Sequence, residues 1–335
     1  MEERGSSTSP NRRVKIFAIL AFSAGFALTA FLLYRVSLHP ILIALVNLGV
    51  GGLIVIALAH VPIICLLGTA WWSIVEPRER SGVRVWTYIW ARAVRDAAAE
   101  ALPFSQVGGY VIGARALNLR GANASSASVS TFVDLTIEFV AKIPYLLLGL
   151  LILEWLKSTK GGTAAIIGIV VCVAATALLL HPRASTVPHR IFERFIPRWD
   201  RIAASRQRLL DVLRHMTDRR AALLPSALLH FFCWLLGAGE TWLIFHLMHT
   251  PVAIGPALVI DSLIGAIRMA AFFVPGAVGA QEGGYVLLCG LFGLSPATAL
   301  AFSFARRGRD ILIAAPVLLS WQWREARKVL PVAPP

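Results

Sequence analysis

The chain has 335 residues, of which 57% are hydrophobic and only 15% are charged, and its formal net charge is +14. A soluble protein of this length would not be so uniformly apolar, and because about 20 apolar residues make one membrane-spanning helix, the composition predicts an all-α, polytopic integral membrane protein. It excludes a transmembrane β-barrel, whose strands would alternate apolar and polar residues over about 10 positions.

The positive charge favours lipid partners over nucleic acid. The arginines lie in segments that flank apolar runs, where anionic headgroups and the cytoplasmic leaflet are the expected partners. The eight histidines form no HExxH motif, so we expect no metal and no other cofactor. The four cysteines lie inside apolar runs without CxxC spacing, as small core residues do; they are Cys65, Cys172, Cys233 and Cys289.

The first part of the chain predicts two spans and an amphipathic segment. Residues 1–13 are polar and predict a disordered cytoplasmic tail, whereas the apolar run 16–34 is too long for a signal peptide and predicts a signal anchor. Residues 41–72 predict the next span, in which glycines and a proline allow a kink. The basic loop 76–84 should lie in the cytoplasm. In 86–100, apolar and charged residues alternate at helical spacing, which predicts an interfacial helix with a solvated charged face.

A repeated pattern of proline and glycine divides the apolar sequence into related halves. Leu-Pro at 102–103 precedes Gly-Gly-Tyr-Val at 108–111, and Val-Pro at 274–275 precedes the same four residues at 283–286. Interrupted helices in corresponding halves are the best sequence indication of a transporter's binding site. We therefore expect 103–118 and 275–292 to dip into the membrane as helical hairpins that meet near its centre. The expected hinge residues are Pro103, Gly108, Gly109, Pro275, Gly276, Gly279, Gly283 and Gly284.

Charged residues inside the apolar runs are candidates for a binding site, because an ionisable group at bilayer depth is costly and usually marks a pathway. In the span 124–153, Asp134 and Glu138 lie one turn apart on one helix face, and Lys142 follows after another turn. A bundle-facing ion pair and a role in translocation both fit this spacing.

Two further charge pairs are expected in the second half. Asp261 and Arg268 share one helix face, which predicts a buried pair. Glu282 and Arg306 can meet where the chain turns back between them, and we expect them within one water molecule of each other, facing a cavity open to lipid. The candidate substrate-binding residues are Glu282, Arg306, Arg307, Gln281, Asp134, Glu138 and Arg268.

The spans form a single predicted transmembrane domain, 14–325, with about seven to eight spans. We expect one repeat at about 86–180 and a second at about 223–323, followed by the tail 326–335. The linker 181–220 is rich in arginine and has apolar residues at near-helical spacing, which predicts helices on the cytoplasmic membrane surface. Nucleic-acid binding is the alternative interpretation of its arginines.

The bias of lysine and arginine toward the cytoplasm predicts a topology. The loop 76–84 should lie inside, whereas 155–162 and 249–255 should lie outside. The last span conflicts with this scheme, because a single helix over 297–323 would place the basic tail outside. Either that helix is broken near Gly308 or the central hairpin crosses the membrane fully.

The string PGAVGAQE, residues 275–282, resembles the P-G-G-x-G-x-x-E signature of the flippase-like transmembrane region found in lysylphosphatidylglycerol synthases and their stand-alone relatives. The string LPFSQVGGYVIGARAL, residues 102–117, resembles the branch associated with hopanoid biosynthesis. The resemblance implies a bacterial inner-membrane protein with paired re-entrant helices, in which Glu282 takes the acidic position and Arg306 or Arg307 the basic one. Ala277 replaces the expected second glycine, so the sharpest turn should differ.

Together these features predict a lipid translocase or lipid-transport accessory protein that is not an enzyme. A headgroup needs a polar cavity at bilayer depth, and broken helices supply unpaired backbone groups and positive N-terminal ends. The expected partners are membrane lipids with anionic or zwitterionic headgroups, including hopanoids, and lipid-synthesis enzymes. We do not expect the aminoacyl-transferase domain of the bifunctional relatives, and no Walker A motif indicates ATP-driven transport.

Three other functions fit the same pattern. A secondary transporter for a small solute would need a site closed off from lipid. A scaffold for lipid-synthesis enzymes would tolerate neutralisation of Glu282 and depend on the basic surface of 181–220. A membrane-embedded enzyme would use Asp134, Glu138 and Glu282 as acids and bases, although their spacing recommends no reaction.

Overall fold

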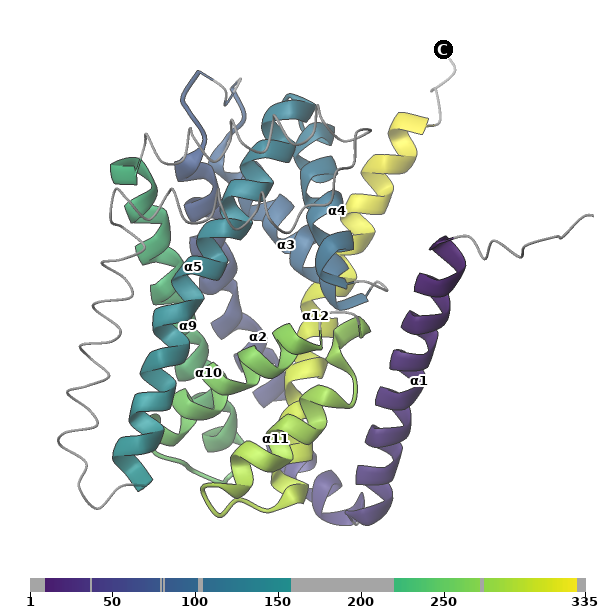
Figure 1. Cartoon of the computed structure of the whole chain (residues 1–335), viewed down its shortest axis with the longest axis vertical. Coiled ribbons are helices and arrows are strands. Elements are labelled where there is room, and N and C mark those ends of the chain that lie inside the picture. The colour runs from purple at the N-terminus through teal and green to yellow at the C-terminus, as the bar shows by residue number, and fades with distance from the viewer. Residues whose placement is uncertain are drawn as a thin grey trace, which may run out of the picture.

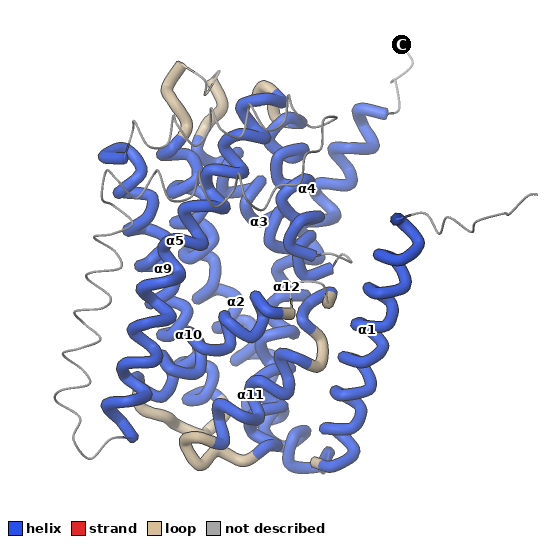
Figure 2. The backbone as a smooth tube through the Cα atoms, viewed as in Figure 1, coloured by secondary structure: helices blue, strands red, loops and turns tan. Residues whose placement is uncertain are grey.

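The computed structural model describes residues 10–36, 38–78, 80, 82–101, 105–157, 220–271 and 274–329, which form a bundle of helices without strands (Figures 1 and 2). The prediction of an all-α chain is therefore confirmed for this part. The first nine residues of the predicted tail 1–13, the hinge Pro103 and all but the last residue of the predicted linker 181–220 lie outside the described residues, whereas 10–13 belong to a helix. Within the described residues, three helices are long and apolar enough to cross a membrane: α2 (Leu38–Ile74), α5 (Ala124–Lys157) and α9 (Arg220–Leu247).

Two further long helices run beside them, α1 (Pro10–Arg35) and α12 (Pro296–Val329). In α2 the helix kinks at Gly49, whose φ of 58° and ψ of 177° are not helical, so the glycines there act as the sequence indicated. By contrast, α12 continues through Gly308, so the first of the two alternatives for 297–323, a break near Gly308, is not what the structure has.

Four short helices form two hairpins. The first consists of α3 (Val85–Ala101) and α4 (Ser105–Leu119), and the second of α10 (Ile254–Ala270) and α11 (Ala280–Gly290). At about 1.5 Å per residue, none of these helices exceeds about 26 Å, which is shorter than a bilayer core. Figure 2 shows that the hairpins enter from opposite ends of the bundle and that the turn between α10 and α11 lies near mid-height.

The hairpins differ from their predicted form. Residues 105–119 and 280–290 are single helices, so each predicted segment supplies only the second arm, and α3 or α10 supplies the first. The helix that carries Asp261 and Arg268, α10, is therefore an arm that stops at mid-height (Figure 2). This arrangement also removes the topological conflict, because the second hairpin returns to its own end and α12 then runs the full length of the bundle (Figure 1).

The paired glycines serve packing and not turning. Gly108 and Gly109 lie inside α4, and Gly283 and Gly284 lie inside α11. A methyl group on Gly109 would come within 2.7 Å of the carbonyl oxygen of Arg95 in α3, and one on Gly284 would come within 2.6 Å of the Ile264 side chain in α10. In both repeats, the second glycine of the pair lets the two arms of the hairpin approach each other closely.

The turn between α10 and α11 contains the residues with unusual backbone angles. Gly276 has φ 56°, Gly279 has φ 82°, and Ala277 between them has φ 47°. Ala277 therefore adopts the left-handed conformation that a glycine would favour, and the alanine is strained. The backbone of α1 packs on this turn, since a methyl group on Gly279 would come within 2.3 Å of the carbonyl oxygen of Gly25.

The largest apolar core among the described residues lies between α2, α9, α10, α11 and α12. Phe245 of α9 stacks on Phe302 of α12 with ring centroids 4.4 Å apart, and Tyr285 of α11 meets Phe302 edge to face. This core fixes the second hairpin to the long helices and so holds one wall of the cavity described next.

Candidate functional site

A cavity of about 780 Å³ lies between the two hairpins and the long helices. Its volume is within the usual range for a ligand site. Residues from both hairpins and from α2, α5, α9 and α12 line it. Its ionisable lining residues are His60, Arg92, Asp96, Glu100, Tyr110, Glu138, Lys142, Glu240, Asp261, Arg268, Tyr285, Arg306, Arg309 and Asp310.

The cavity has an apolar rim that faces outward. Val111 of α4, Phe139 of α5 and Met269 of α10 all contribute to the lining, yet 65%, 42% and 40% of their surfaces are exposed. The lining therefore combines deep ionisable side chains with exposed apolar ones.

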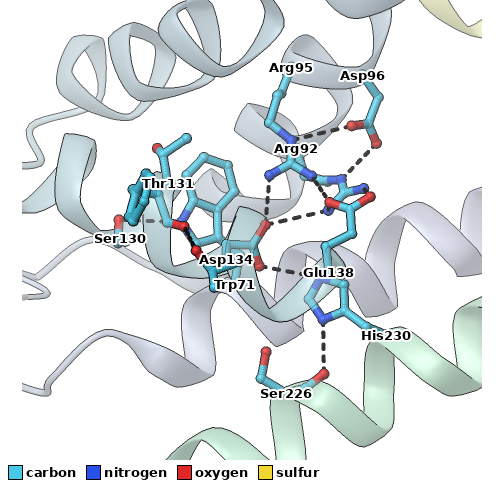
Figure 3. A network of polar contacts seen from close by, with 12 residues as sticks. Trp71, Arg92, Arg95, Asp96, Ser130, Thr131, Asp134, Glu138, Ser226 and His230 are labelled. Atoms are coloured by element: carbon cyan, nitrogen blue, oxygen red, sulfur yellow. Dashed lines mark hydrogen bonds and ion pairs between the residues drawn. The ribbon is translucent and has the colours of Figure 1, made fainter. Parts of the chain in front are cut away.

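The first charge network joins the first hairpin to α5 (Figure 3). Arg95 Nη1 donates to Asp134 Oδ2 at 2.7 Å, and Arg95 Nη2 donates to Glu138 Oε2 at 2.6 Å. Arg92 donates to both oxygens of Glu138 at 3.1 and 3.2 Å and to Asp96 at 2.7 Å. Asp134 and Glu138 thus share two guanidinium groups.

This network corrects two predictions. The charged face of α3 is not solvated, because the side chains of Arg92 and Arg95 are buried against α5. Glu138 is held by these arginines and forms no ion pair with Lys142. Helical spacing identified the amphipathic helix correctly, but the buried acids on α5 required cations, and α3 supplied them.

The second network joins the second hairpin to α12. Arg306 Nη1 donates to Asp261 Oδ1 at 2.7 Å and to the hydroxyl of Tyr285 at 3.1 Å. Asp261 also accepts from the hydroxyls of Tyr145 and Thr241, at 2.8 and 3.0 Å. The predicted pair between Asp261 and Arg268 is therefore wrong.

Arg268 instead connects the two hairpins. Its guanidinium forms an ion pair with Glu100 at the end of α3 and donates to Gln281 Oε1 at 2.8 Å. Arg268 lies two residues before the end of α10, and its side chain therefore extends past that end to the first hairpin. The candidate residues Arg268 and Gln281 thus lie together, at the place where the hairpins meet.

Glu282 has a different partner from the predicted one. Its Oε1 accepts from Arg307 Nε at 2.8 Å and from Ser303 at 2.9 Å, and its Oε2 accepts from the backbone N–H of Gly279 at 2.7 Å. The direct partner is thus Arg307 and not Arg306. Glu282 is only 1% exposed and is not among the residues that line the cavity, because it caps the N-terminus of α11.

A third network lies on the α2 side of the cavity. Arg309 of α12 forms ion pairs with Glu240 of α9 and with Asp310, and His60 Nδ1 lies 2.7 Å from Glu240 Oε2. The sequence offered one signal for this cluster, which is the isolated Glu240 inside an apolar span.

Lys142 stands apart from these networks. Its ammonium group lies 4.2 Å from the centre of the Trp234 ring, and its side chain passes over Gly265 of α10. Among the described residues, no carboxylate lies within ion-pairing distance of it, whereas each arginine that lines the cavity has one. Within the described ranges, Lys142 is therefore the one lysine or arginine of the lining without a carboxylate partner.

The signature string occupies the turn at which the second hairpin meets the first, and the family model described as Lysylphosphatidylglycerol synthase TM region matches residues 16–317. The chain belongs to this family. The match covers both hairpins and the cavity, so this lysylphosphatidylglycerol synthase transmembrane region is a membrane protein of a lipid-metabolism family. No curated protein and no solved structure matched the chain.

Proposed function

We propose that this lysylphosphatidylglycerol synthase transmembrane region binds the headgroup of a membrane phospholipid in its cavity and carries it across the bilayer. The observation that carries the proposal is the charged cavity with an exposed apolar rim. A lipid needs both at once, because its headgroup must be solvated by protein while its tails remain among other tails. A transporter for a small solute has no need of such a rim.

Lys142 supports a phosphate-bearing headgroup. Its ammonium can pair with a phosphate oxygen, and the paired charges around it can accept the second charge of a zwitterionic headgroup. The proposal therefore covers anionic and zwitterionic phospholipids. The hopanoid association rests on the sequence string 102–117 alone.

The two hairpins support a re-entrant arrangement around this site. Each is too short to span the bilayer, and their ends meet beside the cavity, where polar backbone is shielded from lipid. The protein would act as a carrier or as an accessory to lipid-synthesis enzymes, without enzymatic chemistry of its own.

One end of the bundle has the character of the cytoplasmic side. Tryptophans there lie beneath arginines: Trp72 beneath Arg80, Trp90 beneath Arg120 and Arg324, and Trp323 beneath Arg327. Aromatic rings at the interface and arginines toward the cytoplasm would place both chain ends inside the cell. A membrane-impermeant thiol reagent should then label His39→Cys, but not Arg78→Cys, in intact cells; the reverse pattern would invert the topology.

Reconstituted vesicles test the transport proposal. With a fluorescent phosphatidylglycerol, the wild-type chain should move the label to the leaflet protected from an impermeant quencher. Because a charge-assisted hydrogen bond contributes about 1.5–3 kcal/mol, Lys142→Gln should slow this movement about tenfold or more.

Lys157 provides the matched control. It lies on the same helix and also contacts an aromatic ring, that of Phe292, but it is outside the cavity. Lys157→Gln should move lipid at the wild-type rate. Folded wild-type protein that leaves every glycerophospholipid in place, or a Lys142→Gln rate equal to that of Lys157→Gln, would refute the proposal and favour a scaffold.

A further inference from the structure

His230 of α9 lies between two hydrogen-bond acceptors (Figure 3). Its Nδ1 is 2.9 Å from the carbonyl oxygen of Ser226, one turn earlier in the helix. A carbonyl oxygen can only accept, so Nδ1 must carry the hydrogen of this bond. In a neutral imidazole, Nε2 would then be a bare acceptor.

Nε2 faces a second acceptor. It lies 3.5 Å from Asp134 Oδ1, which is an ion-pair distance, and neither atom has a hydrogen-bond partner. Both side chains are fully buried, at 0% exposure. A neutral imidazole beside a carboxylate would leave two lone pairs opposed in a fully buried site, which is costly. In the other neutral tautomer the hydrogen is on Nε2, and the lone pair of Nδ1 would then face the carbonyl oxygen of Ser226. If the imidazole is protonated, both ring nitrogens carry a hydrogen and neither lone pair faces an acceptor.

The surrounding charges call for the same proton. The hydrogen-bonded network contains two guanidinium groups but three carboxylates, those of Asp96, Asp134 and Glu138. A protonated His230 brings it to neutrality. Because Asp134 Oδ2 already accepts from Arg95, the carboxylate stays ionised and the proton resides on Nε2.

A metal ion fits this site less well, although Asp134, Glu138 and His230 have ligand atoms close together. Both oxygens of Glu138 and one oxygen of Asp134 are occupied by guanidinium groups. Two free ligand atoms remain, whereas zinc sites have at least three protein ligands. The adjacent arginines would also repel a cation.

We propose that Asp134 and His230 form a proton-binding site that couples proton movement to the lipid cavity. Arg92 and Glu138 connect the two, because they line the cavity and belong to the same network as Asp134. Loss of the proton leaves this network with an uncompensated negative charge at the cavity wall, so its affinity for an anionic headgroup falls. The coupling rests on the proposed lipid function, whereas the proton site itself does not.

Groups on every neighbouring helix face this network. Trp71 of α2 and Tyr110 of α4 lie against Arg95 at 5.5 and 5.0 Å, and Cys233 follows His230 on α9. The next cation on α5, Lys142, is held over Trp234, outside the hydrogen-bonded network. None of these groups supplies a donor to Nε2 or to Asp134 Oδ1.

Nitrogen-15 spectra of the histidine-labelled full chain in lipid nanodiscs test the site independently of transport. Near neutral pH, the resonances that disappear in His230→Gln should show both ring nitrogens protonated. In Asp134→Asn, whose amide can donate to Nε2, the same ring should be neutral. A neutral His230 in the wild-type chain, or a metal ion retained in stoichiometric amount by the purified protein, would overturn the proposal.

His246 is the control for both measurements, since it makes the same bond to a carbonyl one turn earlier on α9 but is exposed to solvent. A pH gradient across reconstituted vesicles should accelerate lipid movement by the wild type and by His246→Gln, but not by Asp134→Asn or His230→Gln. Equal acceleration of all four would refute coupling. A protonated His230 in a chain that moves no lipid would instead refute the proposed function while upholding the proton site.

Discussion

The two hairpins share a backbone design and carry charges of opposite sign. In each, the second glycine of Gly-Gly-Tyr-Val lets the second arm pack closely on the first. In the first hairpin the buried charges are the arginines of α3, and the acids lie on the following long helix, α5. In the second, the acids lie on the hairpin and the arginines on the following helix, α12. Repetition of the backbone therefore does not require repetition of the charges.

The two charge networks also differ in their dependence on a single residue. Arg95 is only 2% exposed and serves two carboxylates, whereas Arg306 is partly exposed and serves Asp261, which has two hydroxyl donors besides. The first half should therefore be the more sensitive to loss of one cation.

The largest effect is expected from removing these arginines. Arg95→Met should destabilise the protein by about 3–5 kcal/mol, because Asp134 then keeps only one arginine contact, at 3.5 Å with Arg92, and two acids of α5 share one guanidinium group. Arg306→Met should cost less, about 1–3 kcal/mol, since Asp261 keeps its hydroxyl donors. Unfolding in mixed micelles measures both. Adding Glu138→Gln to Arg95→Met should recover part of the loss, and equal costs for the two arginines would show that the networks are equivalent.

A smaller effect should distinguish the two glycine contacts. Gly109→Ala places a methyl group against the backbone carbonyl of Arg95, which cannot move aside, so we expect a cost of about 1–3 kcal/mol. Gly284→Ala meets only the ends of isoleucine side chains, and the helical preference of alanine, about 1 kcal/mol, offsets the strain.

Gly239→Ala in α9 is the control for this pair, because no atom lies near its position and the substitution should stabilise. Thermal unfolding in detergent gives the order of the three variants. A Gly284→Ala protein that is less stable than Gly109→Ala would reverse the assignment of the tighter hairpin.

The smallest effect concerns the turn between α10 and α11, where Ala277 has a positive φ. Ala277→Gly should relieve the strain of a positive φ and stabilise the protein by up to about 1 kcal/mol. Ala280→Gly, three residues later in α11, should destabilise it by about 0.5–1 kcal/mol. The same melting experiment measures both, and a loss of stability with Ala277→Gly would mean that the buried methyl group contributes more than the strain costs.

The sequence predicted the helical bundle, its long apolar helices and the internal pairing of Pro and Gly-Gly-Tyr-Val, because each is a local pattern. It did not predict partners. The predicted pair of Glu282 and Arg306 rested on the cost of leaving either charge alone inside the membrane. In the structure Arg307, the next residue of α12, points to the turn and binds Glu282, whereas Arg306 points to Asp261. One residue on a helix turns a side chain by about 100°, since a turn holds about 3.6 residues.

Arg92, Arg95 and His230 were missed for a related reason. A charged face on an amphipathic helix looks the same whether it meets solvent or buried acids, and the choice depends on which helix packs against it. The sequence did offer one signal. Asp134 and Glu138 lie deep in an apolar span, so they require cations from another helix. Distances between helices could not be read from the spacing along either one.

The contact between the hairpins has a mechanical consequence. Glu100, Arg268, Gln281, Ser303, Glu282 and Arg307 form one continuous line of side-chain bonds. It starts on the first hairpin, passes through the second and ends on α12. Tension applied to either hairpin tip is therefore transmitted to the other, and separating the tips breaks the bond between Glu100 and Arg268. A shift in which both hairpin ends and α12 move together leaves this line of bonds intact.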